Sequence, residues 1–303
     1  MVIRKISYYR VIVSLCLFMF LLSPVFGDEI SAVSFDKELP ENNIVTIQPD
    51  SLRILHNPLT GWVLYASMGV DAADFWAQYD HMYIPELGHN VSVTDYAHTL
   101  YIRASWTDFN PQEDVYGWKI DSNLRAYIEG AYQRNMRLAF RVVVDSRDKR
   151  TEFTPQFVKD AGAKGFMNKG KWSPYSDDSV FQKYYTKFVK ALAKDFNDPS
   201  KVEFIDGFGL GKWGEYHTMI YSTGDDTPKK AVFDWVTDIY SQAFDKVPVV
   251  INYHRWIGAG KDWVDDEHFA ADSEEMLEEA IKKGYSLRHD AVSYTHLTLP
   301  TTS

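Results

Sequence analysis

The feature that most constrains this chain is a regular alternation of strand-like and helix-like segments. Six short runs rich in Val, Ile and aromatic residues have the composition of strands buried on both faces. The predicted strands are residues 61–67, 98–105, 137–144, 202–209, 247–252 and 285–290. Amphipathic segments lie between them, with apolar residues at helical spacing over 124–131, 181–192, 232–243 and 276–281. Strict alternation of this kind predicts parallel βαβ units.

Two architectures are built from such units: a closed eight-stranded barrel and an open doubly wound sheet. No Gly-rich phosphate loop follows the first predicted strand, so the usual mark of a nucleotide-binding open sheet is missing. The sequence therefore predicts an α/β fold, a (β/α)8 TIM barrel truncated after about six strands, over residues 57–290. Residues 28–56 are expected to form an N-terminal leader and linker. The long connection 145–176 is expected either to border a cleft or to be a solvated surface excursion.

The last predicted helix, before the sixth strand, carries its own boundary signals. Asp272 with Glu275 predicts a capping pair at its start, and Gly284 predicts its end.

Both ends of the chain carry distinct expectations. Residues 1–27 have a basic start, an apolar run and small residues before Asp28, which predicts a secretory signal peptide; an uncleaved membrane anchor is the alternative. We therefore expect export to the periplasm or the extracellular space, without stable membrane insertion after cleavage. Residues 292–303 resemble the translation of a transposase adapter used in sequencing libraries, so the natural protein is expected to continue beyond Asp290.

Composition limits the class of partner. The net charge of −10 argues against nucleic acid, because phosphate binding needs clustered Lys and Arg. The chain has 9 Trp, 19 Tyr and 18 Phe, which suits a sugar-stacking cleft, although most aromatic side chains in any protein belong to the core.

Candidate site residues follow from the predicted barrel, in which functional side chains lie at the carboxyl ends of the strands. The richest cluster follows the fourth strand, where glycines at 207, 209, 211 and 214 indicate close approach to the backbone. Glu215 in this cluster is the candidate catalytic carboxylate. The candidate substrate-binding residues are Arg103, Trp106, Asp145, Trp213, His217, Asn252, His254, Arg288 and Asp290.

Glu215 suits the role of general acid in glycoside hydrolysis, which needs one carboxylic acid at the leaving oxygen and a second carboxylate opposite. The alternative is a structural salt bridge between Glu215 and Arg103 or Arg141.

Residues 101–111 (YIRASWTDFNP), followed by Gly117 and Trp118, resemble the second-strand region of the large retaining glycosidase clan that contains β-galactosidases and cellulases. The resemblance spans about residues 57–290 and is most specific to glycosidase-like proteins of gut-type bacteria with a GKWGE.H segment. It implies hydrolysis of an oligo- or polysaccharide with retention, Glu215 as general acid/base, and a nucleophile at the end of strand seven, beyond Asp290. The polypeptide as given is then expected to be inactive. Gly214 stands where the clan has Asn, so the contact to the substrate 2-hydroxyl departs from the clan's pattern.

Two other functions compete with this one. A metal-dependent hydrolase barrel would have a His-x-His pair at the end of its first strand, and 61–67 has none, so neither a metal nor a cofactor is expected. A non-catalytic carbohydrate-binding barrel would keep Trp106, Trp213 and Trp256 as stacking surfaces and would need no second carboxylate.

Overall fold

The structure, a computed structural model, describes residues 62–66, 68–145, 151–253, 257–260 and 272–288. All of them belong to one compact unit, Ile54–Ser303, and the other unit, Met1–Arg53, lies outside the described residues. The expected signal peptide, leader and adapter-like tail all lie outside the described residues. No helix within the described part of the chain is long and apolar enough to cross a membrane.

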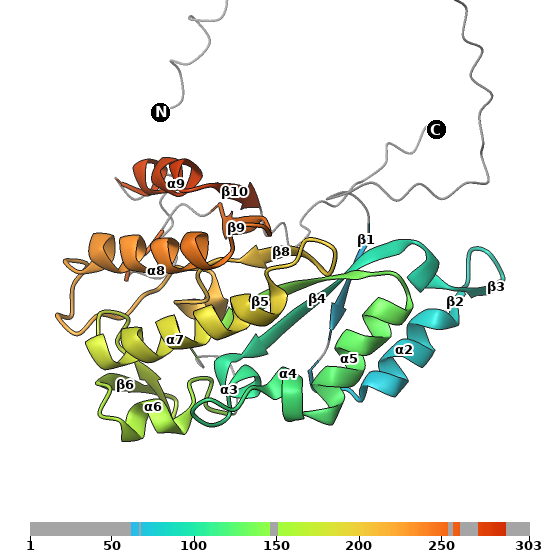
Figure 1. The fold of residues 1–303 in the computed structure, drawn as a ribbon, viewed down its shortest axis with the longest axis horizontal. Helices are drawn as coiled ribbons and strands as arrows, with labels where there is room; N and C mark the ends of the chain where they lie inside the picture. Colours follow the sequence, from blue (N-terminus) through green and yellow to red (C-terminus); the bar gives the residue numbers. More distant parts are fainter. Residues whose placement is uncertain (1–61, 67, 146–150, 254–256, 261–271, 289–303) are drawn as a thin grey trace, which may run out of the picture. The chain divides into compact units, whose positions relative to one another are not determined.

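The main element is a parallel sheet of six strands whose spatial order follows the chain (Figure 1). Its strands are β1 (Trp62–Ala66), β4 (Ala97–Ser105), β5 (Arg137–Val143), β8 (Val202–Asp206), β9 (Val249–Asn252) and β10 (Tyr285–Arg288). All six predicted strands are confirmed, each within about three residues at its ends. Successive parallel strands joined by helices, in chain order, are the arrangement of the first six units of a (β/α)8 barrel, so the predicted fold class is confirmed.

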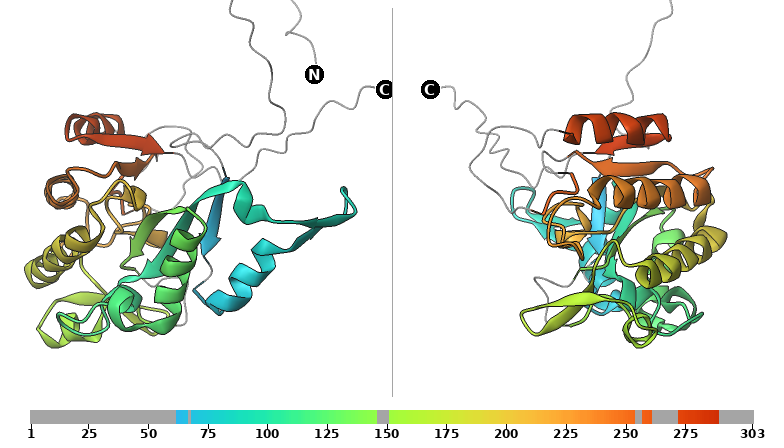
Figure 2. Two further views of the ribbon diagram at one scale, coloured as in Figure 1. Left: turned by 45° about the vertical axis from the view of Figure 1, so that its right-hand side comes forward. Right: turned by 90° about the vertical axis from the view of Figure 1, so that its left-hand side faces the viewer.

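Helices connect the strands and lie on the same side of the sheet, as Figure 2 shows most clearly. They are α2 (Ala72–Asp80), α3 (Trp106–Phe109), α4 (Gly117–Ile120), α5 (Ser122–Gln133), α6 (Gln156–Asp160), α7 (Ser179–Phe196), α8 (Lys229–Ala243) and α9 (Ser273–Lys282). Two of the longer ones begin at a side-chain cap: Asp121 accepts from Leu124 N at 2.6 Å, and Asp178 from Phe181 N at 2.9 Å. These caps satisfy backbone donors that the helix itself leaves without a partner.

Two small hairpins interrupt the alternation, and the sequence did not predict them. The pair β2 (Met82–Ile84) and β3 (His89–Val91) lies between α2 and β4, and the pair β6 (Gly165–Asn168) and β7 (Lys171–Pro174) lies between α6 and α7. Strands of three or four residues give too short an alternation of polar and apolar side chains to be recognised. The second hairpin occupies part of the connection predicted over 145–176.

The boundaries of α9 confirm one expectation and correct another. Gly284 has a φ of +91°, the left-handed conformation that ends helices, as predicted. Asp272 is the residue before the helix, but its side chain makes no capping bond. Instead its carboxylate accepts from Lys229 Nζ at 2.5 Å, so the predicted capping pair with Glu275 is wrong. An ion pair to another helix has replaced the local contact.

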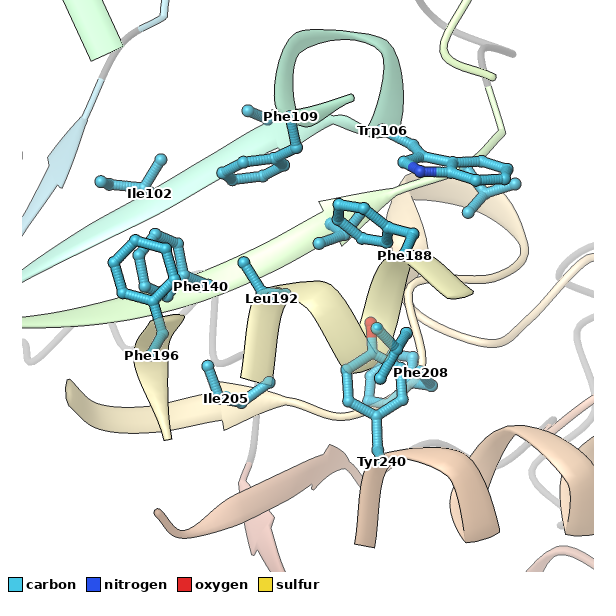
Figure 3. Close-up of a cluster of buried hydrophobic side chains, with 14 of the residues drawn as sticks. Ile102, Trp106, Phe109, Phe140, Phe188, Leu192, Phe196, Ile205, Phe208 and Tyr240 are labelled. Atoms are coloured by element: carbon cyan, nitrogen blue, oxygen red, sulfur yellow. The ribbon is translucent and has the colours of Figure 1, made fainter. Parts of the chain in front are cut away.

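The core between the sheet and α7 is built largely from aromatic side chains (Figure 3). Trp106 is part of this core with 0% of its surface exposed, and its ring meets those of Phe181, Tyr185 and Phe188 at centroid distances of 5.1–6.0 Å. The expectation that Trp106 contacts a sugar is therefore wrong. The sequence placed Trp106 correctly at the end of a strand, but α3 begins there and turns the side chain into the core.

We predict that Trp106→Ala lowers the free energy of unfolding by about 3–5 kcal/mol, the usual cost of removing a buried aromatic side chain. Trp62→Ala is the matched control, because Trp62 is 74% exposed and its loss should change stability by less than about 0.5 kcal/mol. Denaturant unfolding of the two variants measures both values. Equal stability of the two variants would contradict the assignment of Trp106 to the core.

Candidate functional site

The candidate site lies at the carboxyl ends of the strands, where charged side chains share the face of the sheet opposite the helices. The register pairs Arg103 on β4 with Arg141 on β5, and Arg288 on β10 with Asn252 on β9. In a barrel this face is the interior, and its carboxyl end holds the active site. Arginine side chains from several strands therefore lie on this face of the sheet, and buried guanidinium groups need carboxylates as partners.

Asp206, the last residue of β8, is the carboxylate that pairs with two of these arginines. Its side chain is fully buried and accepts hydrogen bonds from Arg141 Nε at 3.1 Å, from Arg288 Nε at 2.6 Å and from the hydroxyl of Tyr101. These donors come from three other strands, β5, β10 and β4. A buried carboxylate is tolerated only with such complete pairing, because its removal from water is costly. Asp206 therefore fixes the relative positions of four strands at the floor of the site.

Arg141 connects Asp206 to Glu215. Its Nη1 donates to Glu215 Oε1 at 2.9 Å while its Nε holds Asp206, and only 3% of the Arg141 side chain is exposed. The other oxygen of Glu215, Oε2, lies 3.4 Å from His217 Nε2. Glu215 retains 16% exposure, so it is the carboxylate of this network that solvent reaches. The salt bridge with Arg141, foreseen as an alternative role for Glu215, is present.

The loop that carries Glu215 has an unusual backbone. Gly209, Gly211 and Gly214 have φ values near +73°, and so do three residues with side chains: Trp213 at +59°, Tyr216 at +60° and Thr218 at +52°. Left-handed conformations of bulky or β-branched residues cost about 1–3 kcal/mol each and persist only when their surroundings enforce them. Such strain is concentrated at functional sites.

Buried contacts enforce this conformation. Two phenols donate to the carbonyls that follow β8: Tyr285 to Gly207 at 2.8 Å and Tyr185 to Phe208 at 3.1 Å. Burial raises the pKa of both phenols well above the usual value, so both stay protonated as donors. A side chain at Gly209 would meet the Val142 carbonyl at 2.3 Å. The glycines do permit close approach to the backbone, as predicted, and the groups that approach it are other parts of the protein.

A cavity of about 600 Å³ lies beside this network at the ends of β1, β4 and β5. Its size is within the range of small-ligand pockets. Its polar wall includes Arg103, Asp108, Asp121 and Asn123, and its aromatic wall includes Tyr65 and Phe153. Phe153 and Thr151 come from the long connection after β5, so that connection borders a cavity, one of its two predicted roles.

The structure brings together some of the predicted site residues. Arg288 joins the Asp206 network, and Arg103 Nη2 donates to the carbonyl of Trp213 at 3.2 Å in the Glu215 loop. The ring of Trp213 meets the imidazole of His217 at a centroid distance of 5.7 Å, and His217 itself is 1% exposed.

Of the remaining predicted residues, two are buried and two lie outside the described residues. Asp145 is buried and accepts from Ser173 Oγ at 3.2 Å, in the β6–β7 hairpin. Asn252 is 3% exposed at the end of β9. His254 and Asp290 lie outside the described residues.

Asp206 and Tyr101 were not predicted as site residues, and Arg141 was predicted only as a structural salt-bridge partner of Glu215. A usable signal was present. Arg141 and Asp206 are ionic residues within mainly apolar strands, and a charge on a buried strand requires a partner of opposite sign. Within the described residues, no group of three or more His, Cys, Asp or Glu side chains is arranged to hold a metal ion.

Comparison with known proteins gives similarity at the level of structure. No family model matches the sequence, and no curated protein matches it. Among solved structures, an endo-1,4-beta-xylanase from Caldicellulosiruptor owensensis is 13% identical with a TM-score of 0.40, over 65% of this chain and 54% of that one. Endo-glycoceramidase II from Rhodococcus sp. is 13% identical with a TM-score of 0.41, over 74% of this chain and 60% of that one.

An exo-beta-1,4-mannosidase from Opitutaceae bacterium strain TAV5 is also 13% identical, with a TM-score of 0.42 over 64% of this chain and 32% of that one. All three similar structures are glycoside hydrolases, and this chain spans less than two-thirds of the length of each. The fold assignment rests on the order and connections of the strands, and these similarities assign neither a substrate nor the role of a residue.

The network makes a prediction about stability. Arg141→Met removes a donor from buried Asp206 and should lower the free energy of unfolding by about 3–5 kcal/mol, the cost of breaking a buried ion pair from one side. Asp206→Asn added to Arg141→Met should recover part of that loss, because the buried carboxylate that has lost one of its two guanidinium partners is then neutral. Chemical denaturation of the single and double variants measures the coupling.

Arg125→Met is the control, because Arg125 pairs with Glu129 on the surface and such pairs contribute at most about 0.5 kcal/mol. Strictly additive effects of Arg141→Met and Asp206→Asn would contradict the network.

Proposed function

We propose that the full-length protein is an exported glycoside hydrolase that acts on an oligo- or polysaccharide, with Glu215 as general acid/base. The observation that carries this proposal is the setting of Glu215: a solvent-accessible carboxylate after the fourth parallel strand, on a strained loop that Arg103, a residue of the cavity wall, contacts at the Trp213 carbonyl. Active sites of (β/α) barrels lie at this end of the sheet. Export rests on the predicted signal sequence at the start of the chain.

The charges around Glu215 support a second carboxylate. Arg141 pairs with both Asp206 and Glu215, and Arg288 pairs with Asp206, so cationic side chains surround this part of the site. Nearby guanidinium groups favour the ionised form of a further carboxylate at this place. In this proposal the barrel is completed beyond Asp290, and its seventh strand brings the nucleophile to this face.

The chemistry assigns a separate task to each oxygen of Glu215. Arg141 engages Oε1, so Oε2 is the oxygen that carries the proton. That proton goes to the glycosidic oxygen as the bond to the anomeric carbon breaks and the nucleophile attacks. In the second step Glu215, now ionised, takes a proton from the water that hydrolyses the glycosyl-enzyme. Retention of configuration rests on the resemblance to the retaining clan.

A non-catalytic carbohydrate-binding barrel is the second candidate, and one observation favours it. Glu215 accepts a charge-assisted hydrogen bond from a buried arginine, as a purely structural carboxylate would. Gly214, immediately before it, brings no side-chain amide to the site. In this alternative the cavity binds a sugar and Glu215 supports the loop.

The variant Glu215→Gln in the full-length protein separates the two candidates. Aryl β-glycosides with leaving groups of different basicity are the substrates. If Glu215 is the general acid, kcat/KM falls about 10²–10⁴-fold for a poor leaving group, because general acid catalysis contributes about that much. The loss is smaller for a leaving group that departs without a proton.

Glu129→Gln is the matched control, since Glu129 is exposed on α5 and should tolerate the change. Turnover by the parent protein that Glu215→Gln leaves intact would exclude the acid/base role. Sugar binding by both proteins without turnover by either would establish the binding function.

A further inference from the structure

Arg103 has hydrogen-bonding capacity that the described residues leave largely unused. Its Nη2 donates to the Trp213 carbonyl at 3.2 Å, its Nη1 lies 3.4 Å from the Tyr65 hydroxyl, and its Nε has no hydrogen-bond partner. None of the Asp and Glu residues that the structure describes forms an ion pair with it. A guanidinium is best satisfied by a planar anion that accepts two parallel hydrogen bonds.

The two carboxylates of the neighbouring network, Asp206 and Glu215, pair with other arginines. Arg141 and Arg288 share Asp206, and Arg141 also holds Glu215. Arg103 is adjacent to Arg141 across the strand pair β4–β5, so the two positive charges repel each other. An anion at Arg103 would relieve that repulsion as well as fill its hydrogen bonds.

The rest of the cavity fits a ligand that has hydroxyl groups. Asp108 and Asp121 line its wall, and each uses one carboxylate oxygen to cap a helix: Asp108 Oδ2 accepts from Ser105, and Asp121 Oδ1 from Leu124. Each retains a second oxygen, which is an acceptor for a hydroxyl donor. The polar lining of the cavity thus combines one guanidinium, that of Arg103, with the acceptor oxygens of Asp108 and Asp121.

An aromatic surface completes the cavity. Tyr65 on β1 is 50% exposed and lines the same space, and its ring lies 5.4 Å from that of Tyr101. Exposed tyrosine rings bind the apolar faces of sugar rings while their hydroxyls stay hydrated.

We propose that this cavity binds an acidic sugar, a uronic acid residue whose carboxylate pairs with Arg103 and whose hydroxyls donate to Asp108 and Asp121. The proposal rests on the proposed carbohydrate function and narrows its substrate to an anionic saccharide. Arg103 is the residue that determines specificity, because a neutral sugar has no group to accept two hydrogen bonds from it.

Two ligands that differ only at carbon 6 test this: methyl β-D-glucuronide, with a carboxylate, and methyl β-D-glucoside, with a hydroxymethyl group. Calorimetric titration of the chain should show tighter binding of the glucuronide by about tenfold, the effect of one charge-assisted hydrogen-bonded pair. Arg103→Met should abolish this preference. Arg103→Lys keeps the positive charge but loses the two parallel donors of the guanidinium, so it should retain part of the preference. It also provides a second test if the Arg103→Met variant does not fold.

Arg125→Met should leave the preference unchanged, because Arg125 lies on the surface of α5. Equal affinity for the two glycosides, failure of both to bind, or a preference that survives Arg103→Met would each overturn the proposal. Binding needs no turnover, so this result is independent of Glu215. A glucuronide preference of the chain, together with no hydrolytic activity of the full-length protein, would support the acidic-sugar site and reject only the enzymatic function.

Discussion

The buried carboxylate of Asp206 is the constraint on which the rest of the site depends. It receives donors from β4, β5 and β10 while standing at the end of β8, so four of the six strands meet at one side chain. Burying such a charge is unfavourable unless every partner is present, which penalises any other register of these strands. Arg141, which holds Asp206, also donates a hydrogen bond to Glu215 and so fixes its position. The order of the strands and the position of the candidate catalytic group therefore share one physical origin.

Rigidity around Glu215 comes from the opposite side of the sheet. Tyr185 and Tyr285 reach from the helix layer and the last strand to the carbonyls after β8, and the glycines there allow their approach. The loop beyond them holds left-handed residues that would relax in solution. A carboxylate on such a loop loses little conformational freedom when a ligand binds, which is the usual advantage of a preorganised site. The cavity lined by Arg103 also contains the acceptor oxygens of Asp108 and Asp121, and the unused hydrogen-bonding groups of Arg103 are the basis for assigning the acidic sugar to it.

Much of the fold was predictable from sequence because buried parallel strands are short apolar runs, and six of them alternate with amphipathic helices. The hairpins were not, since three- or four-residue strands give too little pattern. At the site, the position of Glu215 followed from strand order alone. The error at Trp106 arose because the end of a strand does not fix the direction of a side chain when a helix starts at that residue. Asp206 was missed because its partners are 65 and 82 residues away, and such pairings need the folded sheet.

The proposed two-carboxylate mechanism needs a nucleophile opposite Glu215, and the proposal places it at the end of a seventh strand beyond Asp290. The most direct test is the sequence of the source DNA across the codons after Asp290, read by a method that uses no transposase adapter. We predict two further strand–helix units with a Glu at the end of the seventh strand. A stop codon directly after Ser303, or a completed barrel with no carboxylate at that strand end, would contradict the two-carboxylate mechanism and leave a sugar-binding barrel.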